Sequence, residues 1–178
     1  GEIVDNCQKR PQRLFEEREL SVDECAGYLQ KAINLLKSQT AASDGSEGTL
    51  KVIITVSPIR YAKYGYHGSQ LSKATLLLAA DKLVKENPGV VSYFPAYEIM
   101  NDELRDYRFY KEDMLHPSEQ AVEYIWERFR ATYFGKAAEQ FLEDWRPIRE
   151  ALGHKPFHPE SEEHQKFIAR TEEKKRQF

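Results

Sequence analysis

An apolar run at residues 50–56 constrains the fold of this chain more than any other feature. It reads Leu-Lys-Val-Ile-Ile-Thr-Val and stops at Ser57-Pro58. A β-branched run without polar alternation is typical of a strand covered on both faces, as in a parallel sheet. Residues 90–94 form a second short run that ends at Pro95, and they predict another strand. The chain is therefore expected to have an α/β fold.

Helical patterns alternate with these strands. Ser21 and Glu24 have the spacing of a capping box, in which each side chain satisfies a free N–H at a helix start. Apolar spacing predicts a helix over residues 22–37, and a Leu- and Ala-rich segment predicts another over 70–85. The order helix, strand, helix, strand predicts parallel strands joined by a right-handed crossover.

The chain turns wholly helical from Pro117, which suits the first position of a helix. Another helix is expected after Gly135, with Pro147 restarting a short turn. The charged tail over 160–178 predicts a last helix, with Phe167 and Ile168 as its apolar anchors. We interpret residues 1–135 as part of an α/β domain and residues 136–178 as a helical C-terminal extension.

Two strands are few for a chain of 178 residues. A buried two-stranded parallel sheet leaves hydrophobic edges without partners. We therefore expect that a segment upstream of Gly1 or another chain completes the sheet, and the second possibility predicts a homo-oligomer.

Composition excludes several classes of partner. A net charge of −3 gives no general attraction to nucleic acid or to an anionic membrane. No apolar run is long enough to span a membrane, and the N-terminus lacks the apolar core of a signal peptide, so a cytoplasmic location is expected. Cys7 and Cys25 lack the spacing of a disulfide framework or a zinc site. No cofactor is expected, and Cys25 falls on an apolar helical face.

Asp113-Met-Leu-His116 is the main candidate for chemistry. An aspartate three residues before a histidine can share one backbone turn with it, and an aspartate that orients an imidazole supports nucleophilic catalysis. The pair follows a strand and leads into a helix, and ligand sites of α/β folds usually lie in such loops. The alternative is an aspartate that caps the following helix beside a surface histidine.

Neighbouring residues offer further candidates. Arg105 and Arg108 lie in a dense charged and aromatic segment, and they are candidates for binding an anionic substrate group in bidentate fashion. The alternative for this segment is a salt-bridged structural loop. The loop at residues 59–69, which carries Arg60, is a plausible wall of the site. Ser57 lacks the sequence of a nucleophile elbow, so we interpret it as the end of a strand.

Several runs resemble the GSCFA-domain family of bacterial proteins. They are Thr-Val-Ser-Pro at 55–58, Gln-Leu-Ser-Lys-Ala-Thr at 70–75, Asp-Glu-Leu-Arg-Asp-Tyr-Arg-Phe-Tyr at 102–110 and Asp-Met-Leu-His-Pro-Ser at 113–118. Asn6-Cys7-Gln8-Lys9 is similar to the family's Asn-Cys-His-Lys run, with Gln8 at the usual histidine.

The family is similar to SGNH/GDSL hydrolases, which implies a flavodoxin-like three-layer α/β/α sandwich. Their final Asp-x-x-His block implies His116 as general base and Asp113 as its orienting acid, while Asn6 corresponds to an oxyanion-hole asparagine. The Gly-Ser-Cys-Phe-Ala run that names the family is absent from the chain. The resemblance therefore implies the C-terminal portion of such a domain, without its nucleophilic serine.

The resemblance implies an ester hydrolase that removes acyl or acetyl groups from a small acylated substrate, such as a carbohydrate. Without its nucleophile the chain is expected to be inactive alone. The alternative from another class is a non-enzymatic binding or assembly module, which the unpaired sheet edges and the charged tail favour.

Overall fold

The computed structural model describes Val4 and residues 9–40 and 50–178 of the chain. The chain divides into two compact units, Gly1–Ala121 and Val122–Phe178. Each unit is described by itself.

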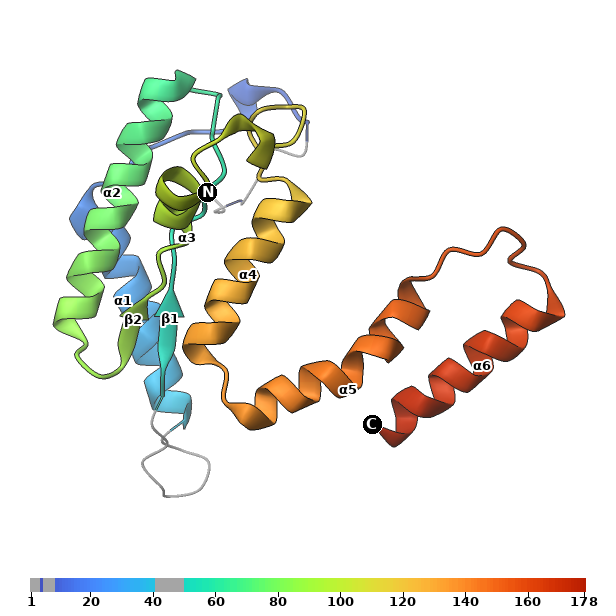
Figure 1. The fold of residues 1–178 in the computed structure, drawn as a ribbon. Coiled ribbons are helices and arrows are strands. Elements are labelled where there is room, and N and C mark those ends of the chain that lie inside the picture. Colours follow the sequence, from blue (N-terminus) through green and yellow to red (C-terminus); the bar gives the residue numbers. More distant parts are fainter. Residues whose placement is uncertain (1–3, 5–8, 41–49) are drawn as a thin grey trace. The chain divides into compact units, whose positions relative to one another are not determined.

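The first unit carries a short parallel sheet of two strands (Figure 1). Its regular elements, in chain order, are α1 (Val22–Thr40), β1 (Val52–Ile54), α2 (Gly65–Glu86), β2 (Val91–Tyr93) and α3 (Ala96–Glu98). β1 and β2 are parallel, with Val52 opposite Val91 and Ile54 opposite Tyr93. The predicted mixed α/β class with a short parallel sheet is therefore confirmed, although both strands are shorter than the apolar runs that predicted them.

One apolar cluster joins α1, α2 and the sheet. Its fully buried members are Ala26, Ile33, Ala79, Leu83 and Val91. Partly buried residues pack against this cluster, among them Cys25, for which the sequence predicted an apolar helical face. The cluster fixes the position of the strand ends that lead into the site.

A local signal sets the start of α1. The capping box is confirmed, because Ser21 N donates to Glu24 Oε2 at 2.9 Å and Glu24 N donates to Ser21 Oγ at 3.2 Å. α2 begins at Gly65, earlier than the predicted start at residue 70. Glycine has a low helix propensity, and Gly65 and Gly68 in the first turn masked the helical pattern.

The second unit holds most of α4 (Glu119–Tyr133), together with α5 (Lys136–Gly153) and α6 (Glu162–Gln177). The prediction that Pro147 restarts a turn is wrong, since Pro147 lies inside α5. Proline there removes one helix hydrogen bond, and burial of the adjacent Ile148 favours continuing the helix. Pro117 is also not the first residue of α4, because it pairs with Tyr110 in an antiparallel bridge.

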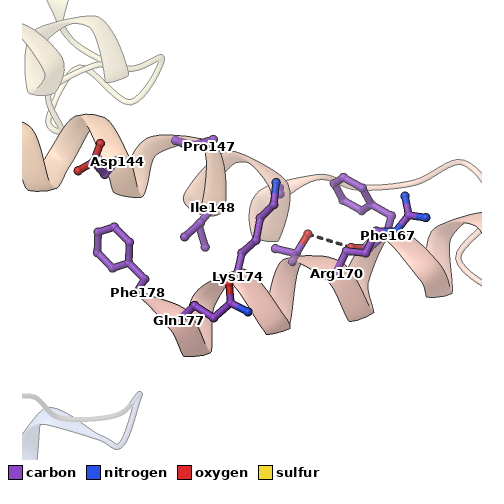
Figure 2. A pocket seen from close by; sticks show the side chains of 10 residues that line it. Asp144, Pro147, Ile148, Phe167, Arg170, Lys174, Gln177 and Phe178 are labelled. Carbon is purple, nitrogen blue, oxygen red and sulfur yellow. Dashed lines mark hydrogen bonds between the residues drawn. The ribbon is translucent and has the colours of Figure 1, made fainter.

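α5 and α6 form a helical hairpin with a hollow of about 550 Å³ between them. Figure 2 shows Ile148, Phe167 and Phe178 around this hollow, with Arg170 and Lys174 beside them. Thr171 is the buried residue of α6, whereas the predicted anchor Phe167 is 41% exposed. The ring of Phe178 packs on Phe141 and Trp145 instead. None of the described helices is long and apolar enough to cross a membrane.

Candidate functional site

Asp113 and His116 form a closed hydrogen-bonded turn in the first unit. Asp113 Oδ2 lies 2.6 Å from His116 Nδ1. Asp113 Oδ1 accepts the backbone N–H groups of Leu115 at 2.8 Å and His116 at 3.0 Å. The predicted proximity of the two side chains is thus present in the structure, and Asp113 caps its own turn rather than the start of α4.

This bonding keeps Asp113 ionised. The N–H groups of His116 and Leu115, followed by the His116 side chain, lower the pKa of the Asp113 carboxyl to about 2. A carboxylate at Nδ1 favours the tautomer with the proton on that nitrogen, which leaves Nε2 with a lone pair. Among the described residues, Nε2 of His116 has no hydrogen-bond partner. Both side chains are about half exposed, so an external group can reach Nε2.

The Asp113 turn is expected to persist in acid. The pKa of this carboxyl is lower in the folded chain than its ordinary value of 3.8, so its contribution to stability is present above about pH 4 and is lost as the pH falls toward 2. An NMR titration of the Asp113 side-chain carboxyl carbon should give a midpoint near 2, with the signal assigned through its absence in Asp113→Asn. A midpoint near 3.8 would show that the turn does not form in solution.

Arg60, from the loop after β1, stabilises the Asp113–His116 turn by hydrogen bonds to its backbone. Its backbone N–H donates to Leu115 O at 3.0 Å and its Nη1 donates to Met114 O at 3.1 Å. Met114 has a φ of 61°, a left-handed conformation that is uncommon for a residue with a side chain. The Arg60 guanidinium also lies 4.2 Å from the centre of the Tyr66 ring. These bonds fix the unusual backbone beside His116, and they hold the loop directly against the turn.

The same loop is anchored at its start. Lys73 of α2 is buried, and its Nζ donates to Ser57 O at 2.6 Å. Burial lowers the pKa of Lys73. Ser57 Oγ accepts the N–H of Ile59 at 3.3 Å, so this hydroxyl supports the loop. The interpretation of Ser57 as the end of a strand is wrong, because β1 ends at Ile54.

A hollow of about 260 Å³ lies beside the turn. It is lined by two guanidinium groups, two phenol rings and two amides, from Arg60, Arg105, Tyr107, Tyr110, Gln70 and Asn101. Asp106 and Met100 complete the lining. Arg60 touches both the hollow and the Asp113 turn, and Tyr110 pairs with Pro117 directly after His116. The hollow and the turn are therefore neighbours.

The structure separates the two candidate arginines. Arg105 lines the hollow, but Arg108 is not among its lining residues. Arg108 instead lies 3.8 Å from Asp106 and 5.2 Å from the centre of the Phe109 ring. The candidate Asn6 falls outside the described residues. Gln70 and Asn101 were not anticipated from the sequence, because neither amide carries a recognisable motif.

Comparisons with known proteins give a family for both parts of the chain. The model of the GSCFA family matches residues 1–129, and the model of the GSCFA domain protein, C-terminal domain, matches residues 145–178. The second match covers the second half of α5 and all of α6. Searches of curated proteins and of solved structures found no match.

Proposed function

This chain belongs to the GSCFA family, and we propose that it supplies the base half of an SGNH-type ester hydrolase. His116 is the general base and Asp113 is the acid that orients it. The observation that carries this proposal is the 2.6 Å contact between Asp113 Oδ2 and His116 Nδ1, with no hydrogen-bond partner for Nε2 of the histidine among the described residues.

The proposed reaction divides ester hydrolysis into two steps. A serine Oγ attacks the acyl carbon while Nε2 of His116 takes the hydroxyl proton, and the resulting imidazolium donates that proton to the departing alcohol oxygen. Water then attacks the acyl-serine with the same histidine as base, which releases the carboxylic acid and the serine. Asp113 stays ionised throughout because its pKa is about 2, so it stabilises the imidazolium formed in each step.

The serine of this reaction is proposed to come from outside these 178 residues. The family's naming run, Gly-Ser-Cys-Phe-Ala, does not occur in the sequence. The hydroxyls of Ser57, Ser69 and Ser118 accept backbone N–H groups within the described part of the chain. These three serines therefore have supporting roles in loops and turns.

A binding or assembly module is the second candidate. In the described residues, β1 and β2 each have a single neighbouring strand, so each strand has one edge without a partner. Such an edge is a template for pairing with another chain.

The two candidates differ in their reaction with a fluorophosphonate, a reagent that labels activated serines. We expect the 178-residue chain to remain unlabelled and the complete translation product of its gene to be labelled in a Gly-Ser-Cys-Phe-Ala run. Hydrolysis of p-nitrophenyl acetate should follow the same pattern. Labelling of the 178-residue chain itself, lost in His116→Ala, would overturn the claim of an external serine. A translation product whose initiator methionine directly precedes Gly1, and which is not labelled, would support the module.

A further inference from the structure

We infer that the hollow lined by Arg60, Arg105, Tyr107 and Tyr110 binds a sugar-like substrate that carries an anionic group. This inference rests on the proposed function for its place in the reaction, since it assigns the hollow to the substrate of His116. The binding itself follows from the lining residues and can be tested separately.

The charge of the hollow points to an anion. Its lining contains two arginines and a single acidic residue, Asp106, in a chain whose net charge is −3. Asp106 is already engaged, because its Oδ1 accepts the N–H of Arg108 at 2.9 Å and its Oδ2 lies 3.8 Å from Arg108 Nε. Arg105 makes no ion pair within the described residues. Its planar guanidinium is therefore available for a bidentate contact with a carboxylate.

The backbone at Arg105 supports this assignment. Arg105 follows a π-helical turn, Ile99–Leu104, and has a φ of 34° in the left-handed region. Its N–H donates to Met100 O at 3.2 Å. Residues with side chains adopt this conformation at a cost, and both π turns and such strain are concentrated at functional sites. The turn places Arg105 at the hollow rather than within a regular helix.

The remaining lining suits hydroxyl groups and a ring. The ring of Tyr107 is 65% exposed and its centre lies 6.4 Å from that of Tyr110, so it offers an apolar face for stacking. Burial raises the pKa of Tyr110, whose phenol therefore stays a hydrogen-bond donor. Gln70 Oε1 accepts from Tyr97 Oη and Asn101 Nδ2 donates to Tyr97 O, both at 2.7 Å. Each amide thus keeps its other end for a ligand.

The volume of the hollow limits the size of the ligand. Its 260 Å³ lies just below the range of about 300–1,000 Å³ for drug-sized ligands. A single charged ring fits this space better than an extended chain does.

The test is a set of NMR titrations of the 178-residue chain with glucuronate, glucose and acetate. Glucose has the sugar ring without the charge, acetate has the carboxylate without the ring, and glucuronate has both. We expect glucuronate to shift the backbone amides of residues 101–110 and to bind at least about tenfold more tightly than glucose or acetate, because one charge-assisted contact supplies a factor of that order. Arg105→Ala should weaken glucuronate about tenfold and leave glucose unchanged. Tyr107→Ala should weaken both sugars.

Arg108→Ala is the matched control, since that arginine lies outside the lining, and it should bind glucuronate like the parent chain. Equal affinity for glucose and glucuronate, or an Arg105→Ala chain that binds glucuronate normally, would overturn the inference. His116→Gln should bind glucuronate unchanged. If the chain binds glucuronate but His116 has no role in ester hydrolysis, the proposed function is refuted and the binding inference stands. If ester hydrolysis depends on His116 but the chain does not bind glucuronate, the binding inference is refuted and the proposed function stands.

Discussion

Replacing His116 by glutamine is expected to lower kcat/KM for ester hydrolysis by the complete gene product about 10²- to 10⁴-fold, the usual contribution of a general base. Glutamine keeps a polar side chain of similar reach, but it cannot accept the serine proton and carry it as a cation. The rate of p-nitrophenyl acetate hydrolysis measures this effect. Asp113→Asn should also lower the rate, because an amide cannot stabilise the imidazolium that Asp113 Oδ2 contacts.

His158→Gln is the control for this prediction. His158 is exposed and lies in the segment between α5 and α6, so its replacement should leave the rate unchanged. A His116→Gln product that keeps the parent rate, with an unchanged far-UV circular dichroism spectrum, would remove His116 from the mechanism.

Replacing Leu83 by alanine should lower the free energy of unfolding of the first unit by about 2–5 kcal/mol. Leu83 is fully buried in the cluster that joins α1, α2 and the sheet, so truncation leaves a cavity there. Amide hydrogen exchange in β1 and β2 measures the effect within the first unit.

Leu78→Ala provides the matched comparison on the same helix. Leu78 is 58% exposed, and substitutions at such positions usually change stability by within about 0.5 kcal/mol. We expect the β1 and β2 amides to lose protection only in Leu83→Ala. Equal exchange in the two variants would show that the cluster does not stabilise the sheet.

The sequence predicted those parts of the fold that depend on local patterns. The apolar run before Ser57 and the capping box at Ser21 each contain their own signal, and the structure has both the parallel strand and the capped helix. The start of α2 and the helical Pro147 escaped prediction, because helix-breaking residues are tolerated there within longer helices. Local propensity is a weak indicator at such positions.

The candidate site divides in the same way. The Asp113–His116 contact lies within one turn and could be inferred from spacing, although its catalytic role stays a prediction. The hollow could not be inferred from the sequence, because its lining residues are far apart in the chain. Arg60 and Gln70 line it together with Asn101 and Tyr107. The spacing of the residues also could not show which of the two arginines, Arg105 or Arg108, lines the hollow. The left-handed backbone at Arg105 makes that distinction.

The shortness of the Asp113–His116 turn affects the order of folding. The hydrogen bonds to the Asp113 carboxylate lie within four residues, and closing so small a loop costs little chain entropy. Contacts of low sequence separation also form fast. The contact between Asp113 and His116 can therefore form before the nearby sheet is complete. Under the proposed function, a nucleophile delivered on a separate polypeptide would meet a histidine that Asp113 already orients.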